Sequence, residues 1–118
     1  MNDSKEMARL AYDAMDDKLA KDITIIDISG VSVVADYFLI ADGKNRNQVQ
    51  AIANNVDEFL GKAGYHAKAT EGYSTANWIL MDYSDVIIHI FSTEDRAFYD
   101  LERIWKDGVE IKREDLDK

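Results

Sequence analysis

The chain is 118 residues long and 47% of its residues are hydrophobic, which fits a single domain that buries its own hydrophobic core. It contains no cysteine, so disulfides, thiol nucleophiles and cysteine-bound zinc or iron–sulfur centres are excluded. Its 14 basic and 23 acidic side chains give a net charge of −9, which disfavours direct binding to DNA or another phosphate backbone and favours encounter with a basic protein.

The first predicted element is a helix that ends near residue 20 and is capped by Asn2 or Asp3. Its apolar residues recur every three or four positions and form one stripe: Met7, Leu10, Ala11, Ala14 and Met15. The residues before it lack the basic-then-apolar layout of a signal peptide, and no segment has the roughly 18 apolar residues of a membrane span. We therefore expect a cytoplasmic protein that does not enter a membrane.

Two strands, a long helix and a third strand are predicted next. Residues 23–28 are short and β-branched, and residues 33–41 are almost continuously apolar, which is typical of a central strand covered on both faces. Gly43 interrupts the apolar run, and residues 45–62 place their apolar side chains on one helical face. With a strand-like stretch at residues 65–70, this pattern predicts a β-α-β crossover.

The last part of the chain predicts a hairpin and a helix. Residues 78–81 and 86–91 read as strands, joined by a turn of Asp and Ser residues. Ser92 begins the last helix, where Asp95 resembles a capping box, and its apolar stripe is Ala97, Phe98, Leu101, Ile104 and Trp105. We predict an α/β (α+β-like) fold in the order α-β-β-α-β-β-β-α, with a mixed five-stranded sheet flanked by helices. The domain spans residues 1–107, and a charged, flexible tail spans residues 108–118.

Few side chains are arranged for catalysis. Lys44 and Arg46 precede a helix N-terminus and could hold an anion, but the single Gly43 is far short of a P-loop or dinucleotide fingerprint. No Asp-x-Asp or Glu-x-Asp pair lies within a predicted strand, so Asp27, Asp36, Asp82 and Asp85 are better explained as turn-forming, solvated residues.

The two histidines give no better case for an enzyme. His66 begins a predicted strand without a visible partner, and His89 lies in mid-strand, where a hydrogen-bonded sheet residue is the expected role. No Gly-x-Ser-x-Gly motif accompanies them. We predict that the protein is not an enzyme and uses no cofactor and no metal.

The segment at residues 78–83 is more informative about binding. Its apolar residues alternate, with Trp78 and Leu80 on one face and Ile79 and Met81 on the other. If one face packs on the core, the other lies either beneath a helix or open to a partner, and exposed tryptophan, tyrosine and methionine are favoured contact residues. The pattern is equally compatible with a strand that is buried on both faces.

Several motifs, read in order, resemble the ribosomal silencing factor (Iojap) family over about residues 3–106. They are Asp27-Ile28-Ser29-Gly30-Val31-Ser32, Asp36-Tyr37-Phe38, Ala41-Asp42-Gly43, Gln48-Val49-x-Ala51-Ile52-Ala53, Glu71-Gly72, Trp78-Ile79-Leu80-x-Asp82-Tyr83-x-Asp85-Val86-x-x-His89-x-Phe91 and Arg96-x-x-Tyr99-x-Leu101-Glu102-x-x-Trp105. No single motif is decisive, but their order and spacing together are specific. One departure is Asn45, where the family usually has serine; asparagine caps a helix comparably.

The resemblance implies a nucleotidyltransferase-like fold that has lost its catalytic acids. It also implies a translational repressor that binds protein number fourteen of the large ribosomal subunit and sterically blocks joining of the small subunit when nutrients are scarce. The partner-binding residues carried over are Trp78 with Leu80 or Met81 as apolar anchors, Asp82 and Asp85 as partners of basic groups, and Tyr83 at the edge. Free members of the family often form dimers, so a homodimer is a further expectation.

Two other functions are compatible with the sequence alone. One is an active nucleotidyltransferase or hydrolase that uses Gly43 and the scattered acids, and tight binding of nucleotide and magnesium would favour it. The other is a homodimer-forming adaptor that presents the same apolar strand to a different basic protein.

Overall fold

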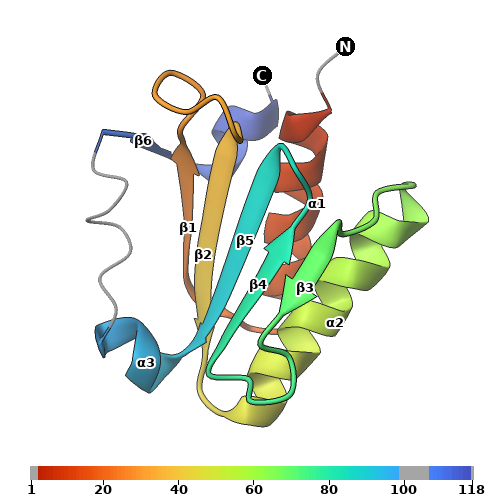
Figure 1. Ribbon diagram of the computed structural model, residues 1–118, viewed down its shortest axis with the longest axis vertical. Helices are drawn as coiled ribbons and strands as arrows, with labels where there is room; N and C mark the ends of the chain where they lie inside the picture. The colour runs from red at the N-terminus through yellow and green to blue at the C-terminus, as the bar shows by residue number, and fades with distance from the viewer. Residues whose placement is uncertain (1–2, 99–106, 118) are drawn as a thin grey trace.

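The computed structural model describes residues 3–98 and 107–117, and Figure 1 shows how their elements are arranged. In chain order these are α1 (Ser4–Asp17), β1 (Lys21–Asp27), β2 (Tyr37–Gly43), α2 (Arg46–Lys62), β3 (Ala69–Glu71), β4 (Trp78–Asp82), β5 (Val86–Ser92), α3 (Thr93–Phe98), β6 (Val109–Ile111) and a 3-10 helix, η1 (Arg113–Asp117). The described strands form one six-stranded sheet in the order β3-β4-β5-β2-β1-β6. No helix within these two ranges is both long enough and apolar enough to cross a bilayer.

The sheet is mixed. β2 pairs in parallel with β5, whereas the pairs β1–β2, β1–β6, β3–β4 and β4–β5 are antiparallel. The expected hairpin of β4 and β5 is confirmed, and Tyr83 N–H donates to the Val86 carbonyl within its turn. The crossover through α2 carries the chain from β2 to β3 at the edge, past the positions of β4 and β5.

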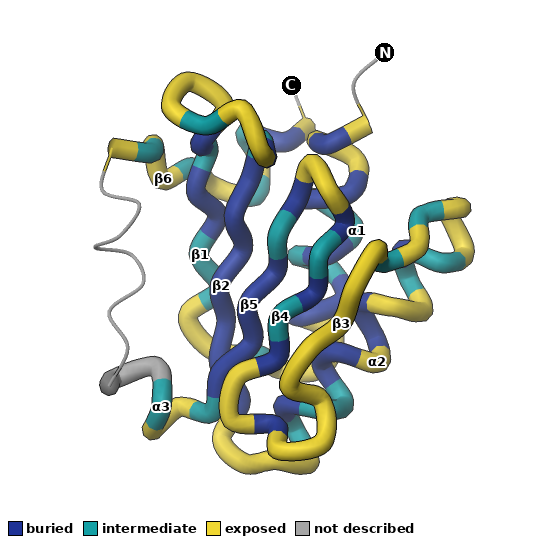
Figure 2. The backbone as a smooth tube through the Cα atoms, in the orientation of Figure 1, coloured by how far each residue is buried: buried dark blue, intermediate teal, exposed yellow. Residues whose placement is uncertain are grey.

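The helices α1 and α2 cover one face of the sheet and lie behind it in Figure 1. Three alanines of α1, Ala8, Ala11 and Ala14, are fully buried, because small side chains let neighbouring elements approach closely. The buried Asn55 of α2 donates from Nδ2 to the Ala14 carbonyl at 2.7 Å, which joins the two helices with a hydrogen bond. Figure 2 shows the resulting pattern, with buried central strands and an exposed β3 at the edge.

A second, smaller apolar cluster lies on the opposite face of the sheet. It consists of Ile26, Ile28, Ala35, Phe38, Ile40 and Phe91, with Ile87 packed against it. All seven residues of β2 are buried, so the expectation of a central strand covered on both faces is confirmed. Its predicted start was wrong, because Val33 and Val34 lie in the preceding loop and Val33 is fully exposed.

The predicted strand count and the predicted tail need correction. β6 adds a sixth strand beside β1, and Leu116 of η1 is buried in the cluster beneath α1. Arg113 binds Asp13 through two hydrogen bonds of 2.9 Å and Asp117 through a third of 2.9 Å. Residues 109–117 are therefore part of the folded unit rather than a flexible tail. The helical stripe predicted at Leu101, Ile104 and Trp105 lies outside the described residues.

Candidate protein-docking surface

The alternation along β4 separates its apolar residues onto two faces. Ile79 and Met81 are buried in the core shared with α1 and α2, and Met81 is only 2% exposed. Trp78 is 37% exposed and Leu80 is half-buried, and both lie on the other face. The strand is therefore not covered on both faces at Trp78, and the alternative left open by the sequence is decided in favour of a partly exposed tryptophan.

The indole of Trp78 is held by residues of the neighbouring strand β5. Its ring stacks on Phe91, the directly opposite residue, with centroids 5.2 Å apart and an angle of 23° between the planes. Its Nε1–H donates a hydrogen bond of 2.9 Å to Nδ1 of His89. The ring centroid of His89 in turn lies 4.5 Å from the ring centroid of Phe38. The exposed tryptophan is thus fixed by a stacked ring and by a hydrogen bond.

His89 is a hydrogen-bonded sheet residue, as expected from the sequence, and it is only 4% exposed. Burial lowers the pKa of this histidine to about 4, so the imidazole is neutral at physiological pH. Because Nδ1 accepts a hydrogen bond, the proton of the neutral ring lies on Nε2. The Nε2 atom is buried and has no hydrogen-bond partner among the residues that the structure describes.

Carboxylates flank the exposed side of β4. Glu71 of β3 pairs with Leu80 and therefore lies on the same face as Leu80 and Trp78. Asp82 follows on that face by alternation, and its Oδ1 accepts from Ser84 N–H at 2.8 Å. Glu71, Gly72, Trp78 and Leu80 line a hollow of about 240 Å³. Glu71, Trp78, Leu80 and Asp82 together are called the Trp78 surface below.

Three of the predicted partner-binding residues are not part of the Trp78 surface: Met81, Tyr83 and Asp85. Met81 and Tyr83 follow the buried alternation of Ile79, and Tyr83 is only 5% exposed. Burial, and secondarily the charge of Asp57, raises the pKa of Tyr83 to about 12. Of the two alternatives for the second apolar anchor, Leu80 is therefore the partly exposed one and Met81 is buried, and Tyr83 does not lie at an exposed edge. Both Met81 and Tyr83 support β4 from the helix side.

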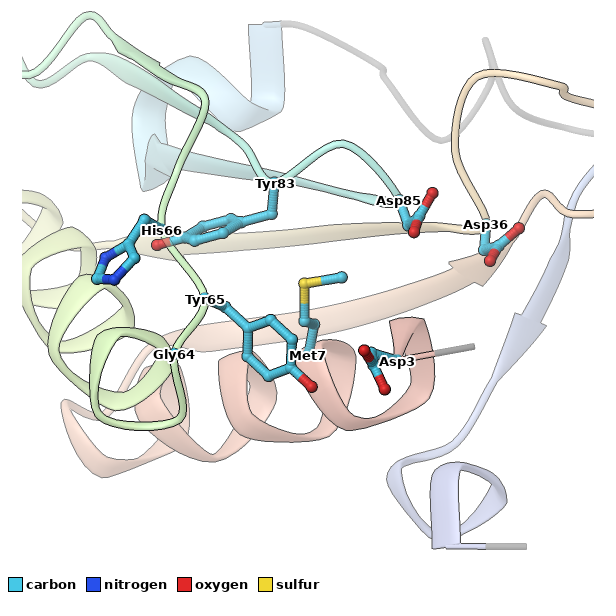
Figure 3. A pocket seen from close by; sticks show the side chains of 8 residues that line it. All are labelled: Asp3, Met7, Asp36, Gly64, Tyr65, His66, Tyr83 and Asp85. Atoms are coloured by element: carbon cyan, nitrogen blue, oxygen red, sulfur yellow. The ribbon is translucent and has the colours of Figure 1, made fainter. Parts of the chain in front are cut away.

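Asp85, the remaining predicted residue, is exposed in the turn after β4 and borders a different hollow, shown in Figure 3. This hollow has a volume of about 690 Å³ and is lined by Asp3, Met7, Asp36, Gly64, Tyr65, His66, Tyr83 and Asp85. The Tyr65 hydroxyl donates to Glu6 at 2.6 Å beside it. Across residues 3–98 and 107–117 no three histidine or acidic side chains converge in a way that could hold a metal ion.

The loop after Gly43 was the other candidate site, and its polar groups are bonded to one another. Asn45 caps α2 by accepting from Gln48 N–H at 2.8 Å, and the Gln48 side chain accepts from Lys44 N–H at 2.7 Å. Asp42 is buried and accepts from the Thr93 hydroxyl at 2.7 Å. Two amide donors that an anion would need are thus already engaged, which agrees with a capped strand-to-helix turn.

These observations define an acidic α/β protein with an apolar, carboxylate-flanked surface suited to binding another protein. The whole chain, residues 1–118, matches the model of the family described as ribosomal silencing factor during starvation. The ribosomal silencing factor of Bacillus subtilis is 42% identical over 104 residues, which cover 88% of each chain. That of Halalkalibacterium halodurans is 39% identical over 111 residues, covering 94% of this chain and 95% of its own.

The fold is shared with a solved relative as well. The crystal structure of a protein from Chromobacterium violaceum superposes with a TM-score of 0.85 at 33% identity, covering 90% of this chain and 88% of that one. The chain therefore belongs to the ribosomal silencing factor family.

Proposed function

We propose that this protein is a translational repressor that binds the large ribosomal subunit through its protein number fourteen and sterically blocks joining of the small subunit under nutrient limitation. The names of its relatives support the ribosomal and silencing part of this proposal. The observation that carries the docking part is the exposed, fixed indole of Trp78 among carboxylates on β4.

Trp78 and Leu80 act as the apolar anchors of the interface. A buried aromatic anchor contributes about 2 kcal/mol or more, which corresponds to roughly a thirtyfold change in affinity. Asp82 and Asp85 pair with lysine or arginine side chains of the partner. Glu71, which was not among the residues expected from the sequence, does the same beside the hollow that it lines with Trp78 and Leu80. Met81 and Tyr83 keep β4 in place from the helix side.

The net charge of −9 acts over a longer range than these contacts. It attracts the protein to a basic partner and raises the association rate, and added salt screens this attraction. No bond has to be made or broken, because the bound protein occupies space that the small subunit needs. In this account the domain keeps a nucleotidyltransferase-like topology without the catalytic acids, works in the cytoplasm and forms a homodimer when free.

The first test is co-sedimentation with purified large ribosomal subunits, using the wild type, Trp78→Ala and Val33→Ala. Val33 is fully exposed in the loop before β2, and this loop lies at the other end of the sheet from the start of β4 (Figure 1), where Trp78 pairs with Phe91. It therefore controls for the loss of an exposed apolar side chain. We expect Trp78→Ala to bind at least thirtyfold more weakly while keeping its fold, and Val33→Ala to bind like the wild type. Wild-type binding by Trp78→Ala would place the docking surface elsewhere.

A further inference from the structure

The polar edge of the Trp78 indole points into the protein, although the ring is partly exposed. Its Nε1–H donates to Nδ1 of His89 at 2.9 Å, and His89 is buried on β5. The part of the indole that a partner can reach is therefore its hydrocarbon surface. A tryptophan that used its N–H for the partner would instead have to leave that donor open.

The imidazole of His89 is confined by aromatic rings from three strands. Its centroid lies 4.5 Å from that of Phe38 on β2 and 6.3 Å from that of Phe91 on its own strand. The Trp78 ring lies 5.8 Å away and also stacks on Phe91. The acceptor nitrogen is therefore presented from a rigid part of the sheet rather than from a mobile side chain.

This arrangement costs stability. The Nε2–H of the neutral ring is buried without a hydrogen-bond partner among the described residues, and an unpaired buried donor is destabilising. Burial also opposes protonation, since the pKa of His89 is lowered to about 4. An apolar ring at this position would avoid both costs. What the histidine supplies, and a phenylalanine would not, is the acceptor for Trp78.

We propose that His89 is a positioning residue for docking, whose buried Nδ1 fixes the Trp78 indole in one orientation before the partner arrives. This inference rests on the proposed function. Fixing a side chain in advance removes part of the ordering entropy that association otherwise has to overcome. It also specifies the partner: the site that receives the indole is apolar and needs no acceptor for the Nε1–H.

The test compares two substitutions that separate the acceptor from the ring. His89→Phe keeps an aromatic ring and removes the acceptor, whereas His89→Asn removes the ring but places Oδ1 close to the position of Nδ1. For each variant we would measure the thermal midpoint, the hydrogen exchange of the Trp78 indole N–H by NMR, and the affinity for purified large subunits. Trp105, the second tryptophan of the chain, gives a reference signal, and Trp78→Phe assigns the two resonances.

We expect His89→Phe to be no less stable than the wild type, to exchange its indole proton faster, and to bind large subunits about five- to tenfold more weakly. His89→Asn keeps slow exchange and near-wild-type binding even where its thermal midpoint falls. In a Trp78→Phe background, which lacks the indole N–H, His89→Phe has no further effect on binding.

Three results would overturn the inference. Wild-type binding by His89→Phe, beside weakened binding by Trp78→Ala, would refute the positioning role and leave the docking surface intact. Equal loss in His89→Phe and His89→Asn would show that ring packing, not the acceptor, matters. If Trp78→Ala itself binds like the wild type, the proposed function fails at this surface and the positioning role fails with it.

Discussion

The loop after Gly43 and the Trp78 surface both look functional in the sequence, but they use their polar groups differently. In the loop, Asn45 and Gln48 bond to backbone amides around them, and Asp42 is buried against Thr93. On the Trp78 surface, an aromatic ring is held firmly while its hydrocarbon face and the neighbouring Glu71 stay exposed. A polar cluster that satisfies itself is a structural turn, whereas rigid apolar area bordered by charge is available to a partner.

The largest expected effect on stability comes from replacing Gly72, which lies in the turn between β3 and β4 and packs directly against the backbone of Trp78. Gly72 has φ +81°, and a Cβ there would lie 2.1 Å from the Trp78 carbonyl oxygen. We expect Gly72→Ala to reduce the free energy of unfolding by about 2–4 kcal/mol and to displace Trp78, with loss of binding to large subunits. Chemical denaturation and co-sedimentation measure the two effects.

Gly64→Ala is the matched control for that substitution. Gly64 also has a positive φ, +92°, but a Cβ there meets no atom within 4 Å. It should cost about 1 kcal/mol from backbone strain alone and leave binding unchanged. Equal stability losses in the two variants would mean that the close approach of Gly72 to the Trp78 carbonyl does not constrain the turn before β4.

A second prediction concerns the pH dependence of stability. The pKa of His89 is about 4 in the folded protein and about 6.5 when unfolded, so the unfolded state binds the extra proton first. The free energy of unfolding therefore has its full value above about pH 6.5. It decreases by up to about 3 kcal/mol as the pH falls toward 4. Denaturation of the wild type and His89→Phe across this range should show a flatter pH profile for the variant. Parallel profiles would refute the burial of a neutral histidine behind Trp78.

A substitution in the loop after Gly43 should change the stability of the protein and leave its binding to large subunits unchanged. Replacing the cap residue with Asn45→Ala removes the hydrogen bond to Gln48 N–H, which we expect to cost about 1 kcal/mol of stability. Because the loop lies outside the Trp78 surface, affinity for large subunits should not change. A variant that stays stable but binds poorly would show that the loop takes part in docking. The loop after Gly43 and the Trp78 surface would then not differ in function.

The smallest expected effect belongs to the exposed carboxylate at the edge of the Trp78 surface. We expect Glu71→Gln to weaken binding only two- to fivefold at low salt, mainly through slower association, and to have no effect at high salt. Glu110→Gln, exposed on β6 at the opposite edge of the sheet, removes the same charge far from β4 and is the control. Equal effects of both substitutions would indicate general charge attraction rather than a contact at Glu71.

Much of the fold could be predicted because periodicity and capping are local signals. The stripes of α1 and α2 were expected from spacing, and the cap at Ser92 is confirmed, since its hydroxyl accepts from Asp95 N–H. The reciprocal half of a capping box is not formed: Asp95 Oδ2 accepts from the Ser92 hydroxyl, and Ser92 N–H donates to the Asn77 carbonyl. β6 was missed because three residues, Val-Glu-Ile, carry too little pattern and form a strand only by pairing with β1.

The site was predictable only in part. Spacing separated Trp78 and Leu80 from Ile79 and Met81, but both sets are apolar, and the side on which α1 and α2 pack decides which set is buried. Glu71 joins the surface through pairing with Leu80, a contact between strands that sequence spacing does not reveal. His89 could be predicted as a sheet residue, but its bond to Trp78 depends on the register of β4 and β5.

The central claim is that occupation of the large subunit through the Trp78 surface is itself the repressive act. Light scattering during the joining of purified subunits tests it directly, with wild type or Trp78→Ala preincubated with large subunits at equal concentrations. The account predicts that the wild type suppresses joining and that Trp78→Ala does so only at concentrations at least thirtyfold higher. Wild-type protein that saturates the large subunit while joining proceeds at its normal rate would contradict it.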